Sequence, residues 1–313
     1  MSDTKDIEII KVASKISDSK LSDSLLASIS AINLINNSSC VNYHLDYSDL
    51  EIATPLFILP IVVYLDSCDK NITNIKLSDY LNLIKFPNGL QPDKMRKSEF
   101  IAIMEQYSKK EYIPIISFPA TKEKDNEKDA ILSTVESIIV RQLHIDSNVA
   151  MGLKYILGEA IDNIIQHANS ERGYIFAQSY PSKGYLDICI ADSGITLLGS
   201  YKSLPNNEIE NDLEAIQAAN RGISTKNLPD AENRGYGIIT SKNMLIEGLK
   251  GSFIMMSGNA LHIYNSKDRR FIGMPHDIRW NGTIIALTIP YNSTEPASLN
   301  VFEPILIKPS FSM

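Results

Sequence analysis

The sequence has few cysteines, and none of them lies near another along the chain. There are three, Cys40, Cys68 and Cys189. An odd number of isolated cysteines excludes a disulfide framework and offers no metal-ligand spacing. In a reducing compartment such residues usually serve as small buried apolar side chains, and we expect that role for all three.

Long hydrophobic runs are also missing. The longest apolar stretch, TPLFILPIVVYL at 54–65, is too short to span a bilayer and contains two prolines. The N-terminal sequence MSDTKDIEIIKVASK has no apolar core of a signal peptide. We therefore expect a cytoplasmic protein without a membrane partner.

Positive charge is in deficit. The chain has 30 Lys and Arg against 37 Asp and Glu, which gives a formal net charge of −7. This balance argues against nucleic acid or an anionic membrane surface as the main partner. A phosphate ligand is not excluded, because backbone amides at a helix N-terminus and a few placed cations can bind it.

What the sequence does contain is a globular composition, 44% hydrophobic and 21% charged, in a chain of 313 residues. This length favours two domains over one. The charged stretch TKEKDNEKDA at 121–130 follows the apolar run YIPIISF, so we predict a boundary near residue 122. The chain would then divide into a domain at 1–122 and a domain at 123–313.

Both parts have the pattern of α/β domains. In the first, we predict strands at 41–50, 71–78 and 112–118, and helices at 53–67, 77–86 and 96–108. In the second, we predict helices at 127–145, 148–168 and 207–220, and a further helix from Gly237. Its strands are predicted at 173–180, 184–192 and 282–291, with a hairpin around SGNA at 257–260. About five strands with helices on one face predict a two-layer α/β sandwich.

The predicted helix that contains GEAIDNIIQHA carries a polar row opposite its apolar stripe. Glu159, Asn163 and His167 recur every four residues and share one face, with Asp162 and Gln166 beside them. The apolar stripe consists of Leu153, Leu157, Ala160, Ile161, Ile164 and Ala168. A solvated outer face is one interpretation of the row, although it lacks Lys and Arg. Its carboxylates and carboxamides are also oxygen ligands that suit a hard cation such as Mg²⁺.

Three glycine-containing motifs follow this helix. Asp192-Ser-Gly ends a predicted buried strand, Gly235-Tyr-Gly precedes a helix, and Gly282-Thr opens the last strand. Glycine lets the backbone approach a ligand closely, and amides at a helix N-terminus form an anion site. Each motif alone is weak, since an Asp at a strand end is usually a turn former and many loops contain G-x-G.

In this order, Glu159-x-x-x-Asn, Asp192-x-Gly, Gly235-x-Gly and Gly282-Thr resemble the motifs of the GHKL ATPase superfamily. That superfamily includes sensor histidine kinases, anti-sigma serine kinases, type II topoisomerases, mismatch-repair ATPases and heat-shock chaperone ATPases. The resemblance covers about 125–292. It implies the Bergerat ATP-binding sandwich, with ATP and Mg²⁺ as cofactors.

The resemblance implies a role for the residues of each motif. Asn163 would bind the Mg²⁺ that bridges the phosphates, and Glu159 would orient or activate a water or acceptor hydroxyl as a general base. Asp192 would accept a hydrogen bond from the adenine amino group. Gly194 would lie against the base, and Thr283 would support Asp192 through its hydroxyl and a bound water.

The remaining family positions surround the phosphates. His167 and Gln166 stand where family members place groups near the phosphates or ribose. Gly235, Tyr236 and Gly237 would supply backbone amides to the phosphates.

One position departs from the family pattern. The usual D-x-G-x-G ends in Thr196 here, which stiffens the start of the segment expected to form the ATP lid, 197–234. The cations of this lid are Arg221, Lys226 and Arg234, and any of them is a candidate for contact with the γ-phosphate.

Several members of the superfamily do not fit. A conventional histidine kinase needs an acceptor histidine on a dimerisation helix, and His144, the one in a suitable place, lacks the family sequence around it. Topoisomerases and chaperones carry a transducer domain, whereas only about twenty residues follow TIPY here. The remaining resemblance is to anti-sigma-type serine kinases and to stand-alone ATP-binding proteins related to them.

The N-terminal part resembles a degenerate STAS domain, the fold of anti-sigma-factor antagonists, over 40–118. Such domains carry a phosphorylatable serine in the loop between a strand and a helix. Here that loop runs from Ser48 to Thr54 and lacks the usual D-S-S-G. Thr54 matches the acceptor position, and it also matches the N-cap of the following helix.

Two functions are therefore open. In the first, the protein is an ATP-dependent serine/threonine kinase or a slow ATPase that acts on a regulatory protein partner. In the second, it is a nucleotide-gated interaction module whose lid or STAS-like unit binds or releases a partner. Glu159 favours the first, because binding alone does not need a base, and Thr196 favours the second. A homodimer is compatible with either function.

Overall fold

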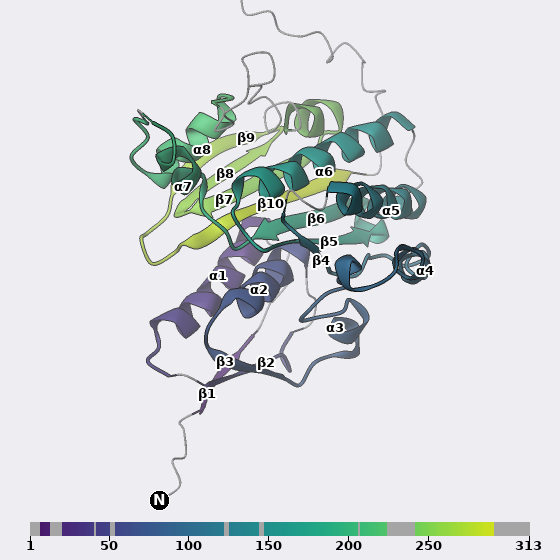
Figure 1. The fold of residues 1–313 in the computed structure, drawn as a ribbon, viewed down its shortest axis with the longest axis horizontal. Helices are drawn as coiled ribbons and strands as arrows, with labels where there is room; N and C mark the ends of the chain where they lie inside the picture. Colours follow the sequence, from purple (N-terminus) through teal and green to yellow (C-terminus); the bar gives the residue numbers. More distant parts are fainter. Residues whose placement is uncertain are drawn as a thin grey trace, which may run out of the picture.

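The computed structural model describes residues 7–12, 21–40, 42–50, 54–121, 125–143, 147–205, 207–223 and 242–290. These residues form two sheets, one parallel and three-stranded, the other seven-stranded, with helices packed on them (Figure 1). The α/β class expected from the sequence is confirmed. No helix in these ranges has both the length and the apolar character needed to cross a membrane.

The small sheet consists of two β-α-β units. Its strands, β1 (Ile7–Lys11), β2 (Asn42–Asp46) and β3 (Asn71–Ile75), pair in parallel in that order. Parallel neighbours need a crossover connection, which α1 (Leu21–Asn37) and α2 (Pro55–Ser67) provide. The predictions of β2, α2 and β3 are confirmed, whereas β1 and α1 were not predicted.

In the seven-stranded sheet the order is β4-β5-β6-β10-β7-β8-β9, and every neighbouring pair is antiparallel. The strands are β4 (Ile116–Pro119), β5 (Arg172–Tyr180), β6 (Tyr185–Asp192), β7 (Ser252–Gly258), β8 (Ala260–Asn265), β9 (Asp268–Gly273) and β10 (Trp280–Pro290). Because β10 runs antiparallel to β6, the start of β10 lies beside the end of β6.

One face of this sheet is covered by helices of the second half of the chain (Figure 1). They are α5 (Asp125–Leu143), α6 (Ser147–His167), α7 (Leu197–Lys202), α8 (Asp212–Asn220) and the π-helical turn η4 (Met244–Gly248). All residues of the apolar stripe predicted for α6 are buried, in one core cluster with residues of the sheet. The amphipathic helix is therefore confirmed, with its polar row on the side away from that core.

Shorter elements make the connections. Between β3 and β4 lie α3 (Asp79–Leu83), η1 (Pro92–Lys94) and α4 (Lys97–Glu105). A single turn, η3 (Pro181–Lys183), joins β5 to β6.

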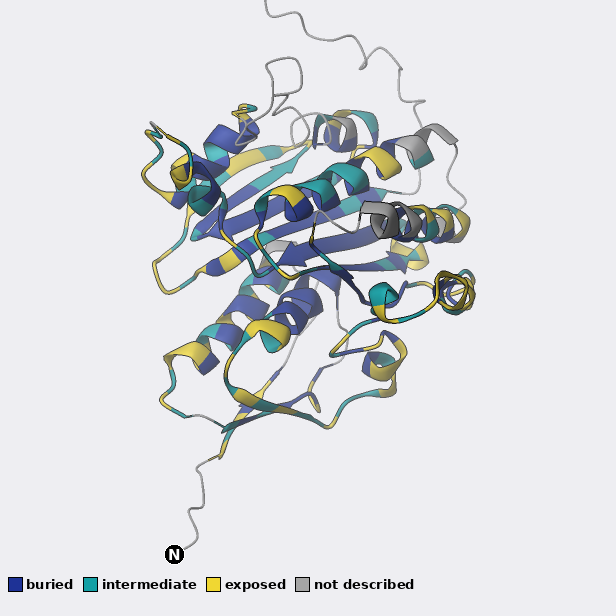
Figure 2. Cartoon of the chain, in the orientation of Figure 1, coloured by how far each residue is buried: buried dark blue, intermediate teal, exposed yellow. Residues whose placement is uncertain are grey.

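The opposite face of the seven-stranded sheet is covered by α1 and α2. Proline is tolerated at the first turn of α2, where its missing N–H would have no helical partner, and every residue from Pro55 to Val63 is buried. A helix that is apolar on all sides has to be enclosed. It lies between the two sheets (Figure 2), in one cluster with Tyr174, Phe176 and Ala191 of the large sheet.

Three details differ from the sequence-based predictions. The strand predicted at 112–118 to complete the N-terminal unit is β4, and it instead forms the edge of the large sheet beside β5. Helices cover both faces of that sheet, not one, because α2 has no polar side to expose. Of the three cysteines expected to be buried, Cys189 is buried, while Cys40 and Cys68 are partly exposed. The division of the chain at residue 122 stays a prediction.

Candidate functional site

Asp192, at the end of β6, is only 1% exposed, and its carboxylate is held by the backbone. Its Oδ1 accepts a hydrogen bond from the Gly194 N–H at 2.9 Å, and its Oδ2 accepts one from the Thr283 N–H at 3.2 Å. The indole N–H of Trp280 donates to the Asp192 backbone carbonyl at 3.0 Å. A carboxylate has about four acceptor positions, so both oxygens keep acceptor capacity for a ligand.

The electrostatics of Asp192 follow from this enclosure. Burial raises the pKa of the carboxyl to about 7, because the charged form loses its hydration. The hydrogen bonds from Gly194 and Thr283 lower the pKa and partly offset that effect. The group therefore titrates near neutral pH, and in either protonation state it presents an acceptor oxygen.

Gly282 explains why the last strand begins with a glycine. Its φ of +97° is unfavourable for residues with a side chain, and a Cβ there would lie 2.3 Å from the Asp192 carbonyl oxygen and 2.5 Å from its Oδ1. Only glycine lets the start of β10 approach the end of β6 this closely. The third motif thus positions the Thr283 N–H that binds Asp192.

Gly194 joins the same loop to the end of α6. A Cβ on Gly194 would lie 1.9 Å from the carbonyl oxygen of Ala168, and the Ile195 N–H donates to that oxygen at 2.6 Å. Just beyond the helix, Asn169 adopts a left-handed φ of +48°, a conformation that often ends helices. The helix with the polar row and the Asp192 motif are therefore in direct contact.

Thr196 begins α7 as its N-cap. Its Oγ1 accepts a hydrogen bond from the Gly199 N–H at 3.1 Å, and the residue is buried. A threonine here therefore fixes the start of the following segment, as the departure from D-x-G-x-G suggested.

Ser257 of β7 was missed by the sequence analysis. Its Oγ accepts a hydrogen bond from the Leu197 N–H and donates one to the Gly282 carbonyl, each at 2.9 Å. It therefore links the start of α7 to the start of β10 from a position that is 1% exposed. Its only signal in the sequence is a hydroxyl at the end of the apolar strand SFIMMSG.

The polar row of α6 is partly covered. Glu159, Asp162, Asn163 and His167 have intermediate exposure, and Gln166 is exposed. A fully solvated outer face would leave all of them open, as Lys154 is on the preceding part of the helix. The row therefore has the exposure of a face that borders other parts of the structure.

Some predicted residues lie elsewhere or beyond the described ranges. Gly235, Tyr236 and Gly237 fall outside the described residues, as do the lid cations Lys226 and Arg234. Arg221 is exposed at the C-cap of α8. Thr283 contacts Asp192 through its backbone N–H, where its hydroxyl was expected.

Thr54 fulfils neither role that the sequence suggested for its hydroxyl. It stands at the N-cap of α2, but its side chain makes no capping hydrogen bond. The residue is 8% exposed, and its Oγ1 is buried without a hydrogen-bond partner. A buried hydroxyl is not accessible to a kinase in this conformation, whereas Ser48 in the same loop is exposed.

The side chains of the candidate site offer few ligands for a metal ion. Within the part of the chain that the structure describes, no three His, Cys, Asp or Glu side chains cluster to hold an ion. Mg²⁺ usually keeps several waters and binds proteins through one or two side chains together with substrate phosphates, so it does not need such a cluster. The carboxamide oxygen of Asn163 fits that mode.

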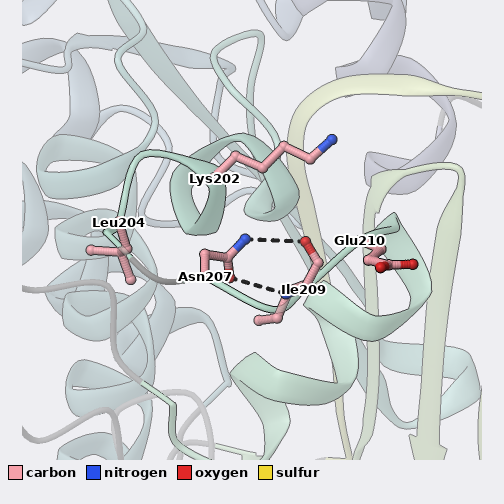
Figure 3. Close-up of a pocket in the computed structure, with 5 residues that line it drawn as sticks. All are labelled: Lys202, Leu204, Asn207, Ile209 and Glu210. Atoms are coloured by element: carbon pink, nitrogen blue, oxygen red, sulfur yellow. Dashed lines mark hydrogen bonds between the residues drawn. The ribbon is translucent and has the colours of Figure 1, made fainter.

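Two pockets of the described residues do not include Asp192 in their lining. One, of about 550 Å³, is lined by residues around Asn207, whose amide is already paired with the backbone of Ile209 at 3.1 and 3.2 Å (Figure 3). Another, of about 610 Å³, lies at the end of α6 and includes Gln166 and His167 in its lining, but not Glu159, Asn163 or Asp192. Its expected place near the phosphates or ribose stays a prediction.

No protein-family model matches the sequence, and no curated protein matches it. The resemblance to the GHKL superfamily accordingly depends on the four motifs and on the contacts that two of them, Asp192-x-Gly and Gly282-Thr, make with each other.

Proposed function

We propose that the protein is a Mg-ATP-binding regulatory protein with a Bergerat-type nucleotide site. It acts as an ATP-dependent serine/threonine kinase or slow ATPase on a regulatory protein partner. The observation that carries this proposal is the buried carboxylate of Asp192, which two backbone N–H groups hold between Gly194 and Thr283. A buried acceptor that retains free lone pairs, with two glycines packed around it, is suited to accept a hydrogen bond from the edge of a nucleobase.

The acceptor also accounts for base selection. Adenine carries an amino group where guanine carries a carbonyl oxygen. In its ionised form, Asp192 is a fixed, buried acceptor that pairs with the amino group and leaves a carbonyl opposed by a like partial charge. The chain at the end of α6 contacts this loop through Ala168, and the polar row of α6 supplies Asn163 for Mg²⁺ and Glu159 for a general base in the same proposal.

Asp192→Asn tests the nucleotide site. We expect ATP affinity to fall by roughly 1–3 kcal/mol, or about five- to 150-fold, because an acceptor is lost in a buried place. Asp187→Asn is the matched control, since Asp187 is also buried in β6 but contacts Thr288 instead. Calorimetric titration of both variants decides the matter. Equal ATP affinity in Asp192→Asn and the wild type would contradict the proposed site.

Glu159→Gln tests catalysis separately from binding. The two side chains are nearly isosteric, so ATP binding should be unchanged, while single-turnover hydrolysis or phosphotransfer should slow by ~10²–10⁴-fold if Glu159 is the base. A variant that binds ATP and turns over at the wild-type rate removes Glu159 from the mechanism.

A second function, a nucleotide-gated interaction module, is favoured by two observations. Thr196 fixes the beginning of the proposed lid by capping α7, and the Thr54 hydroxyl is buried. In this function the bound nucleotide orders the lid, and the partner reads that state. Wild-type turnover at the background rate, together with ATP-dependent capture of a partner, would select it over the kinase.

A further inference from the structure

The cleft at the C-terminal end of α6 has a lining that includes none of the residues around Asp192 that carry the proposed nucleotide site. It has a volume of about 610 Å³, which lies in the range of small-molecule sites, and among the described residues that line it there is no Lys, Arg, Asp or Glu. Hydroxyl and carboxamide groups alternate there with apolar side chains. The polar part of the described lining therefore consists of hydroxyl and carboxamide groups, the His167 imidazole and the backbone.

Three serine hydroxyls in this cleft have their protons directed into the protein. Ser170 Oγ donates to the Arg172 carbonyl at 2.8 Å, Ser200 Oγ to the His167 carbonyl at 3.3 Å, and Ser203 Oγ to the Ser200 carbonyl at 2.7 Å. A hydroxyl has one proton and two lone pairs, so each of these oxygens is left as an acceptor. A ligand in the cleft meets acceptors at all three.

The C-terminal end of α6 adds negative charge to the acceptors of the cleft. α6 has 21 residues and ends at His167, which is itself part of the lining. Here the His167 carbonyl accepts from Ser200 Oγ and the Ala168 carbonyl from the Ile195 N–H. The aligned peptide dipoles of the helix still give this end a partial negative charge of about half an electron. The end of α6 therefore favours a cation over an anion.

Apolar groups complete the lining. Ile165 and Ala120 are buried, while Ile195 is 38% exposed, although it is a large hydrophobic side chain. An alkyl stem would cover the exposed part of Ile195 and gain from its removal from water.

We propose that this cleft binds an alkyl cation, that is, a primary ammonium or guanidinium group on an apolar stem. The head group donates N–H groups to the serine oxygens and lies in the negative field of the end of α6, and the stem lies on Ile195 and Ile165. Gln166 and Asn169 can present their carboxamide oxygens to the same head group. Free polyamines and the lysine or arginine side chains of a partner protein both carry this chemistry.

The test is a titration of the full chain with spermidine and with N-acetyl-lysinamide, followed by calorimetry. We expect saturable binding of at least one of them at or below about 1 mM, and no binding of butyrate, which has an alkyl stem and a negative charge. Tighter binding of spermidine assigns the cleft to free polyamines, and tighter binding of the lysine derivative assigns it to a partner's side chain.

Ser203→Arg provides the decisive variant. Ser203 is exposed, so the fold tolerates the change, while a fixed guanidinium at the cleft repels and displaces the probe. Ser182→Arg, an exposed change in η3 outside this lining, controls for the added charge on an acidic protein. We expect at least tenfold weaker binding in Ser203→Arg and little change in Ser182→Arg. Equal effects of the two, equal binding of butyrate, or no saturable binding up to about 10 mM would each overturn the proposal.

Discussion

At the scale of single residues, the contact between Gly282 and Asp192 is one that a single methyl group would disturb. Gly282→Ala would place a methyl group within 2.5 Å of the Asp192 carboxylate at a φ of +97°. Gly184→Ala is a matched control, with a φ of +75° but no atom within 4 Å of the added Cβ.

We expect Gly184→Ala to cost about 1 kcal/mol of unfolding free energy, which is the cost of a left-handed alanine. Gly282→Ala should cost at least about 2 kcal/mol more and should also displace Asp192. Urea unfolding of both variants measures the difference. Equal destabilisation would mean that the close approach to Asp192 contributes nothing beyond backbone strain.

Asp187 gives the stability a dependence on pH. Burial raises its pKa from 3.8 to about 7, while the hydrogen bond from Thr288 lowers it. Between these values the folded state holds a proton that the unfolded state has lost, so the unfolding free energy falls as pH rises and is lowest above pH 7.

Asp187→Asn removes that titration and keeps an oxygen for the Thr288 hydroxyl. The variant should be more stable than the wild type at pH 8 by up to about 4 kcal/mol, since the pKa rises by about three units and each unit corresponds to about 1.4 kcal/mol. The advantage should shrink toward pH 4. Unfolding curves at both pH values measure it, and a difference that does not change with pH would refute this account of Asp187.

At the scale of elements, the capping of α7 has a measurable effect. Thr196→Ala removes the oxygen that accepts from the Gly199 N–H, and it should lower the unfolding free energy by about 1 kcal/mol. Thr196→Ser keeps that oxygen and should retain most of the stability. If serine and alanine were equally destabilising in denaturant unfolding, the lost methyl group would explain the effect and the cap would not.

The elements also show what the sequence can predict. The stripe from Leu153 to Ala168 predicted α6 because seven-residue periodicity persists over its whole length. β9, with the sequence DRRFIG, has no comparable apolar alternation, and its place at the sheet edge explains why it needs none. β1 was missed because its sequence IEIIK has apolar residues on both faces of the strand: Ile10 is buried, whereas Ile7 and Ile9 are exposed.

Some contacts of the candidate site could also be predicted from the sequence, and others could not. Contacts of Asp192 with Gly194 and Thr283 agree with the motif order, since the motifs lie at ends of elements that meet. Ser257 could not be predicted, because its hydrogen bonds to Leu197 and Gly282 depend on the three-dimensional placement of β7. Likewise, the apolar run of α2 predicted a helix, but its position between two sheets is a tertiary property that periodicity does not encode.

At the scale of the whole molecule, the N-terminal sheet and its helices form part of the core. α1 and α2 cover the face of the large sheet opposite α6, and β4 extends that sheet's edge (Figure 1). A chain cut to 123–313 would lose β4 and expose Tyr174 and Phe176. We therefore predict that this fragment is insoluble or lacks a cooperative unfolding transition.

The full chain should instead unfold in a single transition, with circular dichroism and the fluorescence of its one tryptophan, Trp280, changing together. Two separate transitions, or a soluble fragment of 123–313 with native fluorescence, would show that the two parts are independent domains.

The central claim at this scale is that the molecule binds Mg-ATP and distinguishes it from GTP. Calorimetric titration of the wild-type chain with each nucleotide in the presence of Mg²⁺ tests it most directly. The account predicts saturable binding of ATP at sub-millimolar concentration and at least tenfold weaker binding of GTP, because the Asp192 carboxylate accepts from an amino group. Equal affinity for the two nucleotides, or no binding of ATP at millimolar concentration, would contradict it.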